Sequence, residues 1–253
     1  MRYEQDAGNP FIDGADTRPL KRARRARASA KDEFERPVAF NRTKNTVGHY
    51  TSVVMQRGVP FHSANELAGM QWFDLQPIVS KLWPQPRTFE YEIDGETRQY
   101  TPDIGLILSD GSWHMIEVKP RAYAELEENR RRWPCIASAL RGRKIGFAFL
   151  YEDFLKSVPL CDHLRAMQRF RVDAFSSLRV FALLNDLDAR QSSTIQDVLP
   201  VLQDHGFESD DLFALVSQRH LYVDLTKPLS MTSRVWNACR APLPAIWEDY
   251  HAA

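Results

Sequence analysis

The chain has 253 residues, of which 43% are hydrophobic and 26% are charged, and its formal net charge at pH 7 is zero. These values are typical of a globular protein with one large domain or two modest ones. A membrane span is excluded, because no run of about 18 apolar residues occurs. The first residues lack the apolar stretch of a signal peptide, and three widely spaced cysteines argue against a disulfide framework or a zinc site. We therefore expect a cytoplasmic protein in a reducing compartment.

Residues 1–45 are polar and predict a mostly irregular amino-terminal arm. Between Thr17 and Asp32 the arm contains no acidic residue but several basic ones, which are Arg18, Lys21, Arg22, Arg24, Arg25, Arg27 and Lys31. Such a run is typical of a solvated tail, and it is equally typical of an arm that binds phosphates. Both interpretations stay open, and a nuclear-localisation signal is a third, less favoured one.

Residues 46–158 alternate between helix and strand patterns. Ser63 has the position of a helix N-cap, Asp94-Gly95 is a strong hairpin signal, and the prolines at 84 and 86 predict an extended segment. The predicted elements are a helix at 63–75, strands at 88–93, 96–108 (broken by Pro102) and 112–119, a helix at 122–140 interrupted near Pro134, and a strand at 144–151. This order predicts an α/β core with a mixed sheet.

Residues 159–253 are mainly helical and predict a small winged-helix-like domain. The pattern contains helices at 175–187 and 194–205, a third helix capped by Ser209, and a short strand at 221–225 that belongs to a short hairpin. A winged helix that reads DNA needs a basic recognition helix. The third helix instead opens with Glu208, Asp210 and Asp211, so a protein partner is favoured for this domain.

Two short motifs lie on consecutive predicted strands of the α/β core. Pro102-Asp103 breaks one predicted strand and Glu117-Val118-Lys119 ends the next, and we expect both motifs to lie at the ends of consecutive strands across a tight turn. Carboxylates suit Mg²⁺ or Mn²⁺, and residues two apart on a strand share a face about 7 Å apart. Val118 points into the core, but its carbonyl is available as a further oxygen ligand. This spacing is typical of a restriction-endonuclease-like, PD-(D/E)xK core that hydrolyses phosphodiesters with a metal; solvated charges on ordinary strands are the alternative.

Glu66 is a third candidate acid, because it lies on the helix that precedes the sheet. Two interpretations are open for it. Ser63 and Glu66 have the spacing of a capping box, in which Glu66 bonds back to the Ser63 backbone. The same carboxylate is also placed to serve as a metal ligand.

The residues of these motifs resemble the TnsA-type transposon endonucleases, which are the endonuclease subunits of heteromeric cut-and-paste transposases. The resemblance covers roughly residues 40–235. It rests on Ser63-x-x-Glu66, Gln85-Pro86, Tyr100-Thr101-Pro102-Asp103, Glu117-Val118-Lys119-Pro120 and residues 221–229. One position departs from the pattern, since His62 stands where the family often has an acid.

The resemblance implies a restriction-endonuclease-like catalytic domain at 46–158 and a winged-helix-like domain for partner binding at 159–253. Glu66, Asp103 and Glu117 would be the acidic site residues and Lys119 the catalytic lysine, with Mg²⁺, or alternatively Mn²⁺, as the cofactor. The implied reaction is cleavage of the 5′, non-transferred strands of double-stranded DNA at transposon ends. The implied partners are a TnsB-like transposase and a TnsC-like AAA+ ATPase, in a bacterial cytoplasm and without a membrane.

Two other functions fit the same residues. The first is a stand-alone nuclease of the same fold, such as a restriction or junction-resolving enzyme. The second is a non-catalytic DNA-binding adaptor that retains the remains of a site. Dependence of cleavage on partner proteins separates the first from a transposase subunit, and metal-dependent cleavage separates the second from both enzymes.

Overall fold

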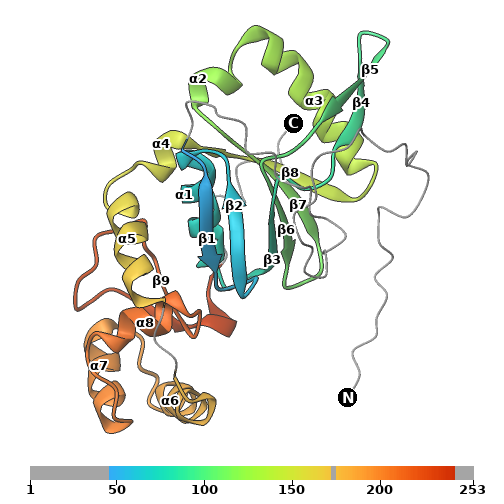
Figure 1. The fold of residues 1–253 in the computed structure, drawn as a ribbon. Helices are drawn as coiled ribbons and strands as arrows, with labels where there is room; N and C mark the ends of the chain where they lie inside the picture. Colours follow the sequence, from blue (N-terminus) through green and yellow to red (C-terminus); the bar gives the residue numbers. More distant parts are fainter. Residues whose placement is uncertain (1–45, 172–174, 243–253) are drawn as a thin grey trace.

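The computed structural model describes residues 46–171 and 175–242, which form a mixed α/β protein (Figure 1). The predicted basic arm at 1–45 lies outside the described residues. A four-stranded sheet lies at the centre, in the order β3-β6-β7-β8. Its strands are β3 (Val79–Pro84), β6 (Ile104–Leu108), β7 (Trp113–Lys119) and β8 (Ile145–Tyr151). The neighbours β3–β6 and β6–β7 are antiparallel and β7–β8 is parallel, which confirms the predicted mixed sheet.

Three antiparallel hairpins accompany the sheet. They are β1 (Gly48–Ser52) with β2 (Arg57–Phe61), β4 (Phe89–Ile93) with β5 (Glu96–Tyr100), and β9 (Leu221–Val223) with β10 (Val235–Asn237). Asp94 and Gly95 have φ values of 54° and 77°, as a two-residue turn with two left-handed residues requires. Strands β1, β2 and β3 were not predicted, because glycine, proline and scattered polar residues hide their alternation.

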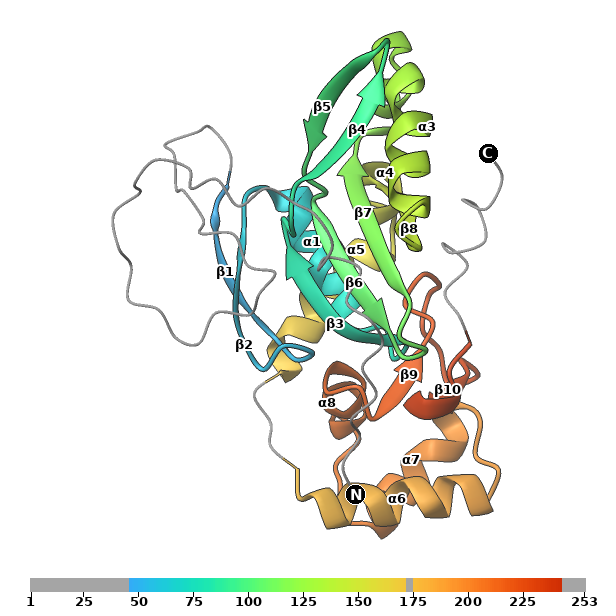
Figure 2. The same cartoon turned by 90° about the vertical axis from the view of Figure 1, so that its right-hand side faces the viewer.

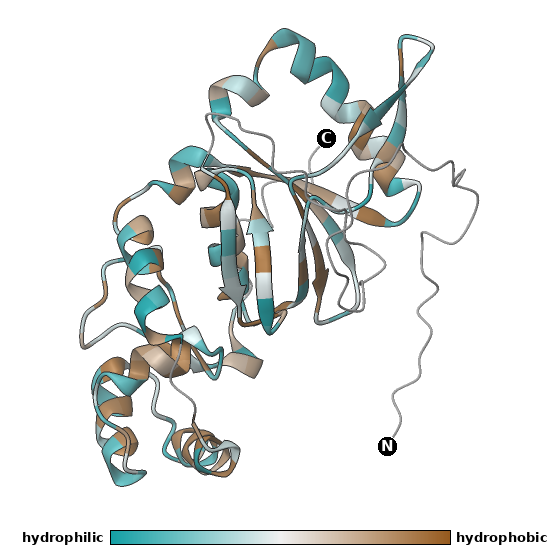
Figure 3. Ribbon diagram, in the orientation of Figure 1, coloured by the Kyte–Doolittle hydropathy of each residue, from teal (hydrophilic) through white to brown (hydrophobic). Residues whose placement is uncertain are grey.

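Eight α-helices occur among the described residues. They are α1 (Ala64–Asp74), α2 (Arg121–Ala124), α3 (Glu127–Arg141), α4 (Glu152–Leu155), α5 (Leu160–Met167), α6 (Ser177–Ala189), α7 (Ile195–Asp204) and α8 (Asp211–Ser217). Two 3₁₀ turns lie at Gln168–Phe170 and Ala238–Arg240. None of these helices is long and apolar enough to cross a membrane. Figure 3 shows the first turns of α3 as a hydrophilic stretch on the outside of the sheet.

Several local predictions are wrong in detail. The helix at 122–140 breaks at Glu125–Leu126 and not at Pro134, which lies inside α3. Side chains satisfy the carbonyls that this break frees, since Asn129 donates to the Tyr123 carbonyl at 2.7 Å and Trp133 to that of Ala124 at 3.2 Å. An early break therefore costs little backbone hydrogen bonding.

Two further local predictions differ from the structure. Ser209 does not cap α8, which begins at Asp211; the Asp211 carboxylate accepts the Glu208 backbone N–H at 2.8 Å. Gln85 was expected to be extended because it precedes a proline, but its φ is +41°. Its N–H donates to the Asp103 carbonyl at 2.7 Å, so a tertiary hydrogen bond holds a conformation that the local sequence disfavours.

The two faces of the central sheet are buried by different helices. Ile104, Ile116 and Leu150 belong to a cluster that includes α1, whereas Met115 and Phe149 belong to one that includes α3. Figure 2 shows α3 running alongside β8 and the β4–β5 hairpin. The sheet thus has a hydrophobic cluster on each of its two faces.

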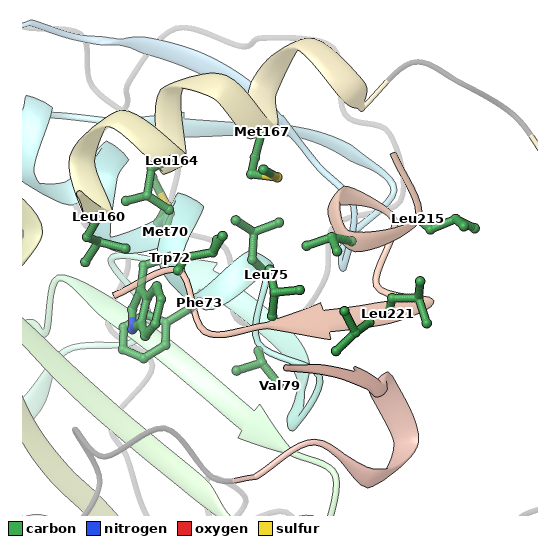
Figure 4. Close-up of a cluster of buried hydrophobic side chains, with 14 of the residues drawn as sticks. Met70, Trp72, Phe73, Leu75, Val79, Leu160, Leu164, Met167, Leu215 and Leu221 are labelled. Carbon is green, nitrogen blue, oxygen red and sulfur yellow. The ribbon is translucent and has the colours of Figure 1, made fainter. Parts of the chain in front are cut away.

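The first of these clusters continues without interruption into the carboxy-terminal part of the chain. In Figure 4, Met70, Phe73 and Leu75 from α1 and its C-cap lie against Leu164 and Met167 of α5. Leu215 of α8 and Leu221 of β9 complete the same cluster. The arrangement of α6, α7, α8 and the β9–β10 hairpin follows the predicted helix, helix, helix, hairpin order. The boundary at 158/159 stays a prediction.

Candidate active site

The two sequence motifs meet at one end of the central sheet. Asp103 immediately precedes β6, and Glu117 and Lys119 are among the last three residues of β7. The antiparallel register pairs Ile104 with Ile116, which brings Asp103 opposite Glu117. The motifs were expected to end two consecutive strands. Instead, one motif starts its strand and the other ends the next, as an antiparallel pair requires.

Hydrogen bonds join the three predicted residues into one cluster. The Lys119 Nζ donates to Asp103 Oδ2 at 3.1 Å and lies 3.2 Å from Glu117 Oε1. The same Asp103 Oδ2 accepts the Val118 backbone N–H at 2.8 Å. An ammonium group is therefore held between two carboxylates, at a place that attracts positive charge.

The cluster is more buried than the sequence suggested. Asp103 is 8% exposed and Glu117 is 3% exposed, although one face of this strand was expected to be functional and open. Lys119 is partly accessible, with 29% of its side chain exposed. Both faces of β7 carry core residues. The cluster therefore lies at a buried end of the sheet, and Lys119 is its partly accessible charged group.

Tyr100 is a site residue that the sequence analysis did not single out for a role. Its hydroxyl donates to Glu117 Oε2 at 2.5 Å, and its side chain is 6% exposed. Burial and the charge of Glu117 raise the pKa of Tyr100 well above its usual range, so the hydroxyl keeps its proton. The signal available in the sequence was its position three residues before Asp103.

Glu66, in the first turn of α1, lies near enough to the cluster for the charges of Asp103 and Lys119 to act on it. The Ser63 hydroxyl caps this helix by accepting the Glu66 N–H at 3.1 Å, as predicted. The Glu66 carboxylate accepts the backbone N–H of His62 at 3.1 Å, and not that of Ser63 as a capping box requires. Gly69 lies one turn further along, where a Cβ would approach Leu150 at 3.1 Å, so α1 packs closely on the sheet.

The charges of these groups influence one another strongly. Burial, and secondarily the charge of Asp103, raise the pKa of Glu66 to about 7. The same two causes raise the pKa of Glu117 to about 7. Burial lowers the pKa of Lys119, but the charges of Asp103 and Glu117 outweigh it and the net shift is upward. The carboxylates thus disfavour one another, and the ammonium is stabilised as a cation.

The donor set fits a magnesium ion only in part. Among the described residues, no group of three or more His, Cys, Asp and Glu side chains could hold a metal ion. Magnesium, however, commonly takes only one or two protein carboxylates and fills its other positions with water and phosphate oxygens. Asp103 and Glu117 provide two carboxylates that already share a cation, and the Val118 carbonyl points to the same strand edge as the N–H that Asp103 binds.

Four further residues, Gln85, Arg131, Arg132 and His62, were considered for this site because of their place in the sequence. Gln85 contacts Asp103 through its backbone, as described above, and its side chain is half-buried. Arg131 pairs with Asp94 at 2.8 Å on the β4–β5 turn, and the Arg132 guanidinium lies over the Trp133 ring, 4.2 Å from its centre. These arginines therefore have structural partners outside the cluster. His62 contributes its backbone to Glu66, and burial lowers the pKa of its side chain.

Comparison with known proteins adds no family to this description. No model of a known protein family matches the chain, and no curated protein matches it either.

Proposed function

We propose that this protein is a metal-dependent DNA endonuclease. The observation that carries the proposal is the Lys119 ammonium held between Asp103 and Glu117 at the end of β6 and β7. Two carboxylates and a lysine around one point are the groups needed to bind a divalent cation next to a phosphate. Asp103, Glu117 and the Val118 carbonyl would hold Mg²⁺, or Mn²⁺ in its place, with Glu66 beside them.

Each residue has a role that follows from its surroundings. When bound, Mg²⁺ would supply an activated water and stabilise the negative charge of phosphodiester hydrolysis. Lys119 stays protonated, because two carboxylates raise its pKa; it would therefore stabilise the phosphate oxygens and orient water, and would not accept a proton. Asp103 holds both the Lys119 ammonium and the backbone next to it, so it fixes the position of the groups around the metal.

We further propose that the nuclease acts as the TnsA-like subunit of a cut-and-paste transposase and cleaves the 5′ strands at transposon ends. The support is the motif resemblance together with a carboxy-terminal part that follows the helix, helix, helix, hairpin order. Its helix α8 begins at Asp211, and Glu208 and Asp210 precede it directly. Such a start repels DNA phosphates and favours a protein partner, of the TnsC-like ATPase kind, over direct DNA reading.

The test is Mg²⁺-dependent cleavage of DNA that carries the ends of the transposon, with the transposase and ATPase partners present. Asp103→Ala should lower the cleavage rate by at least about 100-fold, because it removes a ligand and the partner of Lys119. Asp110→Ala is the matched control, since Asp110 lies at the opposite end of the β6–β7 pair and accepts hydrogen bonds from the Ser112 backbone and hydroxyl.

Three outcomes separate the functions. An Asp103→Ala protein that cuts as fast as the parent would show that the assigned site is wrong. Rapid cutting of arbitrary DNA by the isolated parent protein would favour a stand-alone nuclease. Binding of DNA without any metal-dependent cleavage, in all partner combinations, would favour the adaptor.

A further inference from the structure

Tyr100 connects the aromatic core to the candidate metal ligands. It is the last residue of β5, in the β4–β5 hairpin, and its hydroxyl donates to Glu117 on β7. The oxygen–oxygen distance of 2.5 Å is at the short end for a hydroxyl that donates to a carboxylate, a strong class of hydrogen bond. A surface tyrosine would not be expected to form so close a contact with a buried acid.

Two neighbouring aromatic rings hold the ring of Tyr100 in place. It packs edge-to-face against Trp133 of α3 and Phe147 of β8, with ring centres 6.1 and 6.0 Å away. Such aromatic packing restricts the ring, and a restricted ring fixes the position of its hydroxyl. The hydroxyl is therefore presented to Glu117 by a rigid part of the protein.

The two oxygens of Glu117 have different partners. Oε2 accepts from the Tyr100 hydroxyl, on the side of the aromatic cluster that contains Trp133 and Phe149. Oε1 faces Lys119 at 3.2 Å and shares that ammonium with Asp103. One oxygen is thus fixed by the core, and the other is left for the cation site.

We propose that Tyr100 is a positioning residue, which holds Glu117 so that Oε1 faces the metal position. The proposal rests on the proposed nuclease function and adds to it a residue that does not touch metal or substrate. Groups that bind a metal ligand from behind orient it, and their loss commonly weakens metal binding.

The chain geometry supports this role. Tyr100 and Asp103 lie three residues apart, and Pro102 limits the backbone between them. One short segment therefore supplies a metal ligand, Asp103, and the hydroxyl that orients the other ligand, Glu117. Any movement of this segment would displace both carboxylates together.

The test compares the full-length Tyr100→Phe protein with the parent in Mn²⁺ binding, measured by electron paramagnetic resonance, and in Mg²⁺-dependent cleavage. We expect Mn²⁺ affinity to fall about 10- to 100-fold and the Mg²⁺ concentration for half-maximal cleavage to rise by the same factor. At saturating Mg²⁺ the cleavage rate should return to within about threefold of the parent, because Tyr100 touches no reacting group. Tyr91→Phe is the matched control, since Tyr91 belongs to the same buried cluster and is not a partner of Glu117.

The outcomes distinguish this inference from the function on which it rests. Unchanged Mn²⁺ affinity in Tyr100→Phe, with a parent that binds Mn²⁺ and cleaves, would overturn the role of Tyr100 and leave the nuclease intact. An equal loss in Tyr91→Phe would also overturn it, because the effect would then come from the aromatic cluster. A parent that binds no Mn²⁺ and never cleaves would overturn the proposed function and the inference together.

A second variant covers the case in which Tyr100→Phe does not fold. Replacing Tyr100 by 4-aminophenylalanine keeps the ring and offers a weaker N–H donor to Glu117. We expect its Mn²⁺ affinity to lie below that of the parent and, where Tyr100→Phe folds, above that of the phenylalanine variant. An affinity equal to the parent's, or equal to that of Tyr100→Phe, would contradict the inference.

Discussion

Asp103 is the residue through which the site is assembled. A single carboxylate oxygen accepts both the Val118 N–H and the Lys119 ammonium, so it fixes a backbone segment and the Lys119 side chain at once. The Asp103 carbonyl also accepts the N–H of Gln85, on the segment that follows β3. Substitution of Asp103 is therefore expected to disturb metal binding and local backbone together.

One substitution at Glu66 separates its structural role at the start of α1 from its proposed role beside the metal. Glu66→Gln keeps an oxygen that accepts the His62 N–H but loses the charge. We expect the free energy of unfolding of the variant to lie within about 0.5 kcal/mol of the parent's, because the local hydrogen bond remains. We expect Mg²⁺-dependent cleavage to fall at least about 100-fold, because a charge beside the metal is lost.

Chemical denaturation and single-turnover cleavage measure these two quantities on the same preparation. Cleavage at the parental rate by Glu66→Gln would show that Glu66 serves only the helix start. Glu90→Gln, on the exposed side of β4, controls for the loss of an acidic charge elsewhere in residues 46–158.

At the scale of elements, α1 links the site to the carboxy-terminal part of the chain. Its first turn carries Glu66, and its last residue, Asp74, accepts from the Arg171 guanidinium at 2.7 Å. Beyond the helix, the Arg219 guanidinium donates to the carbonyls of Gln76 and Pro77 at 3.0 and 3.1 Å. Two arginines from the carboxy-terminal part thus hold the end of the helix that positions Glu66.

The pair formed by Asp74 and Arg171 gives a stability prediction. Asp74 is fully buried, and it also accepts from the Ser52 hydroxyl at 2.6 Å and the Val53 N–H at 2.9 Å. Asp74→Ala should lower the free energy of unfolding by about 3–5 kcal/mol, because it leaves a buried arginine without its partner. Urea denaturation measures this change.

The control for this prediction is a pair that lies in water. Asp162→Ala removes the partner of Arg165, in an ion pair whose two side chains are largely exposed. Screening by solvent should leave the unfolding midpoint unchanged in this variant. Similar effects of the two substitutions would argue that burial of the Asp74 pair contributes nothing to stability.

At the scale of the whole molecule, the two predicted domains share one hydrophobic core. The cluster that contains Met70 and Phe73 of α1 also contains Leu164 of α5 and Leu215 of α8. Separating the parts at residue 158 would expose this apolar surface to water, at a cost of about 25 cal/mol per Å². We therefore expect the described parts to unfold as one cooperative unit.

Calorimetry of the full chain should show a single transition, and a chain cut after residue 158 should lack cooperative melting and bind a hydrophobic dye. Truncation is then expected to remove metal binding together with partner binding. Two separable transitions in the full chain, or a folded fragment that retains Mn²⁺ binding, would contradict the shared core.

The motifs and most elements were available in the sequence because they depend on local chemistry. Alternation and turn residues predicted the hairpin at Asp94-Gly95, a continuous apolar run predicted strand β8, and the serine N-cap predicted α1. Strands β1 and β3 were missed, since their residues become strand only through pairing with β2 and β6. The break in the helix after β7 depends on hydrogen bonds from Asn129 and Trp133. No local sequence pattern predicts these hydrogen bonds.

The sequence by itself indicated which residues to test as a site, because two carboxylates and a lysine at this spacing are typical of metal-dependent phosphodiester hydrolysis. Only the tertiary structure decided how they are arranged. The antiparallel register sets Asp103 opposite Glu117, and folding brings the Tyr100 hydroxyl to Glu117. Burial raises the pKa of both Glu66 and Glu117. Register, burial and the distance between charges arise from contacts between segments far apart in the chain, so they are fixed only when the chain is folded.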